Sequence, residues 1–241
     1  ETSYEILDAS GTVVASGEDG ILNEATFGDC AAVVLGCMDS DACNYDLNAT
    51  LDDDSCTYAN MCGSCDDDFS CLDDYCFTEN FDYEDGFDMT TTENFGAWDG
   101  IATGGTVQLG AMVISGTDDV VTTLPVMPAG VWEVSFDMDL IEGGGYFNLG
   151  NTGNTSDWGW QESIYFNPDG TGNGDFQNFE WQTGQPIQVQ VFIDVPNNDA
   201  QLWVNGNQVI DDIFWSGSFG GVDFYNGNEG TYSIDNFSLC A

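Results

Sequence analysis

The chain of 241 residues contains no lysine, no arginine and no histidine, yet it carries 43 aspartate and glutamate residues. No carboxylate can pair with a cationic side chain, so each must be hydrated, accept hydrogen bonds or meet a cation from solution. Like charges at this density repel one another and oppose compaction. We therefore expect the protein to take positive charge from its surroundings. Calcium is the cation that best suits carboxylate-rich oxygen ligands.

The missing cations exclude several functions. Nucleic-acid binding depends on lysine and arginine that neutralise phosphates, and attraction to anionic membranes has the same requirement, so we expect neither partner. Without histidine there is no Ser-His-Asp triad and no histidine-ligated zinc or iron. No apolar run approaches the roughly 18 residues that a membrane-spanning helix needs.

Nine cysteines are present, and eight of them lie between Cys30 and Cys76. Dense cysteines in a segment poor in apolar residues indicate disulfides, and hence an extracellular or cell-surface location. Thiolate zinc at the Cys62–Cys65 CxxC pair is the alternative, but there is no second CxxC and the aspartates that follow suit calcium better. Because nine is odd, one thiol is left over or pairs outside the chain. The pairing stays open among Cys30, Cys37, Cys43, Cys56, Cys62, Cys65 and Cys71.

Three regions follow one another along the chain. Residues 1–29 predict a β-hairpin, or the end of a preceding domain, because two short apolar strands flank the turn signal Ser10-Gly11. Residues 30–76 are rich in cysteine and aspartate and too poor in apolar residues to build a core, so they need cross-links. Residues 77–241 are long enough to bury a core of their own.

The middle region contains a candidate calcium site. Oxygen-bearing side chains at alternate positions of an irregular loop turn toward one centre, as in an EF-hand loop. Ala49 and Ser55 stand where an EF-hand needs Gly and Glu, so this is not an EF-hand. A solvated acidic linker without metal is the alternative. The candidate ligands are Asp39, Asp41, Asn44, Asp46, Asn48, Asp52, Asp53 and Asp54.

At residues 36–58 the chain resembles the GCxDxxACNYxxxAxxDDxSCxY repeat. That repeat is found in large secreted and surface proteins of marine gliding bacteria, often exported by the type IX pathway, and it is similar in spirit to thrombospondin type 3 calcium repeats. The resemblance implies a calcium-binding, disulfide-stapled connector between larger modules. It implies no enzymatic activity.

Residues 77–241 predict an all-β fold, an antiparallel β-sandwich or jelly roll. Residues 131–140 alternate with Trp132, Val134, Phe136, Met138 and Leu140 on one face, and residues 187–195 form a second apolar row. Asn205-Gly206 predicts a hairpin between 202 and 210. Further strands are expected near 106–115, 119–124, 145–149, 160–166, 218–225 and 231–239.

This last region resembles the concanavalin-like and carbohydrate-binding jelly rolls of secreted polysaccharide-active proteins. The resemblance rests on residues 79–82, 165–170 and 232–237. It implies that the first and last strands are neighbours, with a structural calcium held by Asp235 and by Asp82 or Glu84. Adjacent terminal strands would also bring Cys76 and Cys240 together, so we predict a disulfide between them.

Two patterns bear on carbohydrate. Residues 137–142 resemble the ExDxxE strand of concanavalin-like glycoside hydrolases, but Asp137 replaces the first Glu and the strand alternates, so we favour an outward acidic face and no enzyme. Trp158 and Trp160 lie on the same side if the segment is extended, which makes them a candidate sugar platform. The alternative is that they belong to the core, as Trp132 does.

Two functions of different classes remain. The first is a non-catalytic structural or adhesive segment of a large secreted or surface protein, stiffened by calcium and disulfides, which assembles with copies of itself into a fibre. The second is a carbohydrate-binding module of a secreted polysaccharide-active enzyme. Self-association without glycan affinity favours the first, and monomeric polysaccharide binding favours the second.

Overall fold

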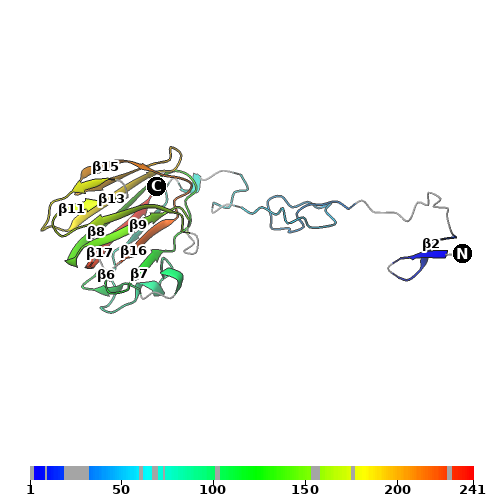
Figure 1. The fold of residues 1–241 in the computed structure, drawn as a ribbon, viewed down its shortest axis with the longest axis horizontal. Coiled ribbons are helices and arrows are strands. Elements are labelled where there is room, and N and C mark those ends of the chain that lie inside the picture. The colour runs from blue at the N-terminus through cyan, green and yellow to red at the C-terminus, as the bar shows by residue number, and fades with distance from the viewer. Residues whose placement is uncertain are drawn as a thin grey trace. The chain divides into compact units, whose positions relative to one another are not determined.

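The structure, a computed structural model, describes residues 3–8, 10–18, 33–59, 62–66, 70–72, 74–100, 104–152, 158–174, 177–226 and 230–241. The chain divides into two compact units, Glu1–Asp67 and Asp68–Ala241 (Figure 1). This boundary lies earlier than the residue 76/77 boundary expected from the sequence. The residues before Cys76 belong with the second unit because Tyr75 packs edge-on against Trp132 and its carbonyl accepts from the Ala241 amide.

The first unit contains the predicted hairpin, formed by β1 (Ser3–Leu7) and β2 (Val13–Glu18). Asp8 closes its turn by accepting hydrogen bonds from the Ser10 hydroxyl and from the Ser10 and Thr12 amides. Residues 33–59 form irregular loops in which isolated bridges join residues 35 and 51 and residues 37 and 45. Disulfides connect Cys37 with Cys56 and Cys43 with Cys65.

These disulfides decide against zinc at the CxxC pair. Cys65 is bonded to Cys43, and Cys62 and Cys71 are also disulfide-bonded, so neither CxxC sulfur is a free thiolate ligand. Cys30 lies outside the described residues. Paired cysteines persist in an oxidising space, which agrees with the extracellular location expected from the sequence.

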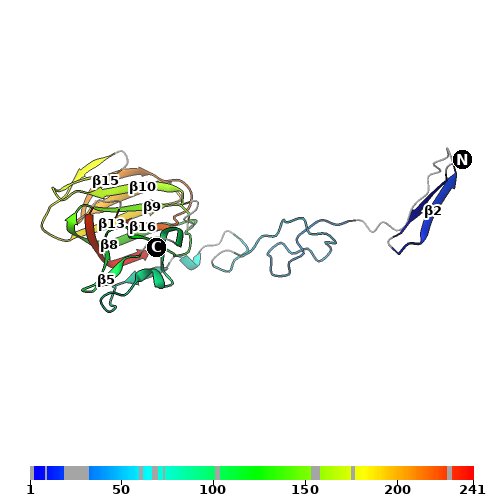
Figure 2. The same cartoon turned by 60° about the horizontal axis from the view of Figure 1, so that its bottom comes forward.

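The second unit is the predicted antiparallel β-sandwich, built from two sheets (Figures 1 and 2). The seven-stranded sheet has the order β12-β11-β10-β9-β16-β7-β4, and the eight-stranded sheet has the order β15-β14-β13-β8-β17-β6-β5, with β3 also pairing with β17. The strands of the first sheet are β4 (Phe95–Ala97), β7 (Asp119–Thr122), β9 (Gly145–Gly150), β10 (Trp160–Phe166), β11 (Thr171–Asn173), β12 (Asn178–Glu180) and β16 (Gly221–Tyr225). The strands of the second are β3 (Cys76–Glu79), β5 (Thr106–Gln108), β6 (Ala111–Ile114), β8 (Val131–Gly143), β13 (Ile187–Asp194), β14 (Asp199–Val204), β15 (Asn207–Phe214) and β17 (Gly230–Cys240).

Aromatic side chains join the two sheets. Phe136 of β8 meets Phe147 of β9 and Phe224 of β16 edge-on, with ring centroids 5.1 and 5.2 Å apart. These contacts put the alternate residues of β8, from Trp132 to Met138, into the core, as the sequence pattern predicts. Each such aromatic ring buries a large apolar area, and the edge-to-face geometry adds a favourable electrostatic contribution.

Turns account for where the strand predictions succeed and fail. Asn205 and Gly206 both have positive φ, 50° and 74°, which confirms the predicted hairpin turn between β14 and β15. The single strand expected at 106–115 is instead a hairpin of β5 and β6, because Leu109 and Gly110 have φ of 55° and 79° and reverse the chain. In the part of the chain that the structure describes, the helical elements are three-residue 3₁₀ turns, η1 (Ser70–Leu72), η2 (Met89–Thr91) and η3 (Trp98–Gly100).

Among the described residues, no helix has the length and apolarity that crossing a bilayer requires.

The first and last strands of the sandwich are neighbours, as the resemblance to concanavalin-like jelly rolls implied. β3 pairs with β17 in a register that sets Cys76 directly opposite Cys240, and the predicted disulfide joins them. It closes a loop with a sequence separation of 164 residues. The bond therefore ties the first strand of the sandwich to its last strand.

We predict that replacing both cysteines of this bond, Cys76→Ser with Cys240→Ser, destabilises the sandwich by about 5 kcal/mol, because the unfolded chain regains the entropy of an open loop. Urea unfolding followed by tryptophan fluorescence measures this, since all seven tryptophans lie in the second unit. The control is Cys37→Ser with Cys56→Ser in the first unit, which should leave that transition in place. Equal midpoints for the two double variants would contradict the prediction.

Candidate functional site

One face of the seven-stranded sheet turns away from the core and carries polar and aromatic side chains. The alternate residues Phe147 of β9 and Phe224 of β16 point to the core, so their neighbours along each strand point to the opposite side. The pairing of β7, β16, β9 and β10 then sets these neighbours beside one another. We call this set the polar face: Asp119, Val121, Tyr146, Asn148, Ser163, Tyr165, Asp223 and Tyr225.

Three tyrosines form a row across the polar face. The ring of Tyr146 lies 4.6 Å from that of Tyr165 on one side and 6.2 Å from that of Tyr225 on the other. Tyr232 reaches across from β17, and its hydroxyl donates to the Tyr146 and Tyr225 carbonyls at 2.5 and 3.2 Å. This buried hydroxyl therefore links β9 and β16 through the backbone carbonyls of the two residues that carry these tyrosine rings. Burial raises the pKa of Tyr146 to about 12.

Beside the tyrosines, a buried polar chain runs across the same face. The indole of Trp158 donates to Asn148 Oδ1 at 2.7 Å, and Asn148 Nδ2 donates in turn to Asp223 Oδ2. Asn148 is fully buried and Asp223 is 2% exposed. Burial, and next the negative charge of Asp119, raise the pKa of Asp223 well above its usual value. Asp119 and Asp223 were not singled out from the sequence.

The two tryptophans predicted as a sugar platform differ in their exposure to solvent. Trp158 is buried, whereas Trp160 is 58% exposed. The segment is not extended, because Gly159 between them has a φ of 61°. Trp158 packs closely against the backbone at Gly150, where a Cβ would come within 2.3 Å of the indole. Trp158 is therefore buried, but against the polar face and not in the core between the sheets as Trp132 is, and the platform hypothesis is left with Trp160.

Trp98 of η3 brings the two indoles into one cluster. Its ring centroid lies 5.6 Å from that of Trp158 and 5.5 Å from that of Trp160. The backbone beside Trp160 is fixed by Gln161, whose Oε1 accepts from the Ser216 amide at 2.8 Å. Trp160 is thus an exposed aromatic ring held on a rigid support next to the polar face.

The glycosidase-like carboxylates lie on the other sheet. Asp137 and Asp139 point outward from β8, since Phe136 and Met138 between and beside them are buried. Asp137 accepts a hydrogen bond from Asn236 of β17. This is the outward acidic face expected from the alternation, and it belongs to the sheet opposite the polar face.

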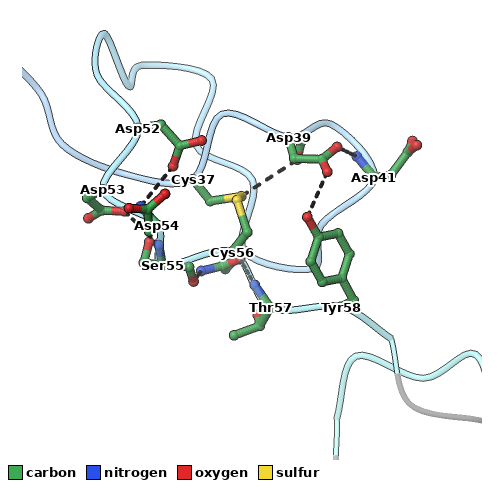
Figure 3. Close-up of a disulfide and its surroundings, with 11 residues drawn as sticks. Cys37, Asp39, Asp41, Asp52, Asp53, Asp54, Ser55, Cys56, Thr57 and Tyr58 are labelled. Carbon is green, nitrogen blue, oxygen red and sulfur yellow. Dashed lines mark hydrogen bonds between the residues drawn. A yellow bond between two sulfur atoms is a disulfide. The ribbon is translucent and has the colours of Figure 1, made fainter.

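The acidic loops of the first unit hold their carboxylates against their own backbone (Figure 3). Asp46 Oδ1 accepts from the Asn48 amide, Asp52 Oδ1 from the Asp54 amide and Asp53 Oδ1 from the Ser55 amide. Such local turns satisfy the carboxylates without a cation. In Figure 3, residues 52–54 and the pair Asp39 and Asp41 lie on different sides of the Cys37–Cys56 disulfide.

Two further predicted calcium ligands, Asn44 and Asp39, make hydrogen bonds that connect different parts of these loops. Asn44 joins the two limbs of the disulfide loop, because its Oδ1 accepts from the Thr57 amide and its Nδ2 donates to the Ser55 carbonyl. Asp39 accepts from the Asp41 amide and from the Tyr58 hydroxyl, and these bonds, in that order, lower its pKa. Asp41 itself is exposed.

Nowhere among the described residues do three or more carboxylate or cysteine side chains gather at metal-binding distances. This applies to the loops of the first unit and also to the meeting point of the first and last strands. There Asp82 is exposed, and Asp235 accepts from the Asn236 amide. As they are placed, the predicted ligands do not form a ready site, and calcium binding stays a prediction that requires these side chains to turn toward an ion.

Comparisons with known proteins give likenesses to solved structures alone; no family model and no curated protein matches. A sialidase is 14% identical with a TM-score of 0.47, and the match covers 65% of this chain but only 18% of the sialidase. A β-glucanase of Bacillus licheniformis is 14% identical with a TM-score of 0.45, over 69% of this chain and 97% of the enzyme. A carbohydrate-binding module of Bacillus subtilis is 8% identical with a TM-score of 0.42, over 63% of this chain and 98% of the module. At these identities the assignment of the fold rests on the two sheets themselves.

We predict that Trp158→Phe destabilises the sandwich by about 1–3 kcal/mol, because the buried Asn148 Oδ1 loses its indole donor. Chemical unfolding measures the loss. Trp160→Phe is the matched control and should change the free energy of unfolding by less than about 0.5 kcal/mol, since that ring is largely exposed. A similar small change in both variants would show that the indole hydrogen bond contributes little.

We also predict that calcium raises the midpoint of thermal unfolding of the whole chain, that EDTA lowers it, and that magnesium restores it poorly. Calcium at about a hundred times its Kd adds about 2.7 kcal/mol for each site. Scanning calorimetry at low ionic strength measures the shift. The combined variant Asp52→Asn, Asp53→Asn and Asp54→Asn keeps the side-chain oxygens that cap the turns but removes charge, so its response to calcium should be smaller. A midpoint that EDTA leaves unchanged would contradict calcium binding.

Proposed function

We propose that the second unit binds a neutral polysaccharide, without catalysis, through Trp160 and the adjoining polar face. The observation that carries this proposal is the exposed Trp160 indole, held beside Trp98 at the border of the polar face, where Tyr225 is exposed and Tyr165 is half-buried. Sugars bind flat aromatic rings through their apolar faces, while nearby polar groups fix their orientation. A polar rim on a rigid scaffold is the usual construction of such a site.

The negative charge of the chain favours neutral over anionic polysaccharides as ligands. Sulfated and uronic-acid polymers are anionic, and recognition of anionic groups relies on arginine or lysine donors. This chain has neither. Its 43 carboxylates would repel such polymers at low ionic strength, so a neutral glycan is the ligand that its chemistry accepts.

The position of the acidic strand supports binding without hydrolysis. A glycosidase needs two carboxyl groups flanking the bond that is cleaved. The carboxylates of the hydrolase-like pattern, Asp137 and Asp139, point out from the eight-stranded sheet, whereas Trp160 and the tyrosines belong to the seven-stranded sheet. The ligand and these carboxylates would therefore lie on opposite sheets.

The structural or adhesive function expected from the sequence is a second proposal, and it concerns the first unit. Disulfide-stapled loops with an acidic surface suit a connector between modules, and the Cys37–Cys56 and Cys43–Cys65 bonds support this part. A more specific proposal is that copies of the chain assemble into a fibre at a cell surface. Calcium-dependent multimers in size-exclusion chromatography would support it, and a monomer at all calcium levels would count against it.

We predict that at least one neutral polysaccharide retards the chain in affinity gel electrophoresis, using laminarin, xylan and galactomannan as probes, while alginate and carrageenan do not. Trp160→Ala should weaken that binding roughly tenfold or more, a loss of about 1.4 kcal/mol. Phe214→Ala is the control, because this ring is also exposed but lies on β15 of the other sheet.

Two results would overturn the proposal. One is that no neutral polysaccharide retards the wild-type chain in calcium-containing gels. The other is that Trp160→Ala and Phe214→Ala migrate alike in every gel.

A further inference from the structure

Two aspartates meet on the polar face without a cation. Asp119 lies on β7 and Asp223 on β16, and the register Asp223↔Val121 and Tyr225↔Asp119 makes them diagonal neighbours on one side of the sheet. Their side chains lie close enough for the charge of Asp119 to act on the carboxyl group of Asp223. Asp223 is 2% exposed, and Asp119 is half-buried with its Oδ1 atom buried, so water screens the pair only weakly.

The neighbouring hydrogen bonds determine whether each polar group acts as a donor or as an acceptor. An indole N–H is only a donor, so Trp158 obliges Asn148 to present its oxygen to the indole and its amide N–H to Asp223. Asp223 Oδ2 is thereby an acceptor. Its other oxygen, Oδ1, is buried and receives no donor from any residue that the structure describes.

The surroundings supply no positive charge. The other titratable groups near the pair are Tyr146 on β9, Tyr225 on β16, Tyr232 on β17 and Asp118 just before β7, and none of them is cationic at any pH. The chain holds no lysine, arginine or histidine at all. Two bare carboxylates in contact away from water repel each other strongly, and the usual solution is a proton shared between them.

We propose that Asp119 and Asp223 share one proton at neutral pH, and that this proton completes a hydrogen-bonded relay from Trp158 through Asn148 and Asp223 to β7. The relay joins three strands of the sheet and the loop that carries the tryptophans. The shared proton thus acts as the positive charge that holds the polar face together. This inference does not depend on what the face binds.

The sign of the pH dependence follows from where the proton is held. Burial and the neighbouring carboxylate raise the folded pKa of Asp223, whereas in the unfolded chain an aspartate titrates near its ordinary value of about 3.9. The stabilisation is therefore fully present below the unfolded pKa and is lost progressively as the pH rises toward the folded pKa. Above about pH 6 the exposed carboxylates are fully ionised and no histidine titrates, so this pair dominates the slope up to about pH 7.5.

The experiment follows the unfolding equilibrium constant of the full chain between about pH 6 and 7.5, in EDTA and in calcium. The wild-type constant should rise with pH by up to roughly tenfold per unit, as one extra proton bound in the folded state requires. Asp223→Asn should flatten this slope, because the amide accepts from Asn148 and donates to Asp119 without a titratable proton. Asp137→Asn, on the other sheet, should keep the wild-type slope.

Infrared spectroscopy of the wild-type chain gives a second measurement that does not depend on how the variants fold. A protonated carboxyl C=O band should persist at pH 7, when all exposed carboxylates are ionised, and it should disappear in Asp223→Asn. The proposal is overturned if the wild-type chain shows no such band and no slope. A slope and a band that calcium abolishes would also overturn it, and would assign a metal ion to the pair instead.

Discussion

Every carboxylate in this protein has to find its partners among neutral donors, because the chain offers no side-chain cation. The structure meets this constraint locally. Asp8, Asp52 and Asp169 each accept from amides or hydroxyls two to four residues ahead, so a charge and a turn are satisfied by the same hydrogen bonds. Because these bonds favour the ionised carboxyl, they lower the pKa of Asp8 and Asp169. The acidic composition thereby becomes a source of turns in both units.

The lack of side-chain cations has the opposite effect on a buried carboxyl group that finds few donors, because its pKa is then raised and not lowered. Asp118 can still accept from the Ser115 amide at 2.9 Å, because it lies at the beginning of a strand where backbone donors are free. Asp223 lies in the middle of a strand whose amides already serve the sheet, so one side-chain amide is its donor among the described residues. Position in the sheet, rather than residue type, decides whether a buried carboxyl group finds a backbone donor, and burial raises the pKa of Asp223.

Much of the sandwich was predictable because its long strands obey simple alternation. Alternating apolar residues predict two central strands, from Trp132 to Met138 and from Ile187 to Ile193, and Asn205-Gly206 predicts a hairpin. The strands β4, β11 and β12 were not predicted, since three residues are too few to show alternation. The turn at Leu109 was missed for another reason. A leucine rarely adopts positive φ, and the following Gly110 alone does not end an apolar pattern.

The candidate site was less predictable than the fold because it depends on register. Asn148, Asp119 and Asp223 are separated by long stretches of chain, and each looks like an ordinary polar position of an alternating strand until the pairing of β7, β16 and β9 sets them together. Trp160 was recognised from its residue type, but its separation from Trp158 depends on the single positive φ of Gly159. A face assembled from four strands leaves no local motif. The sequence therefore identifies the aromatic ring that a ligand would meet first, while the buried polar relay behind that ring emerges only from the paired strands.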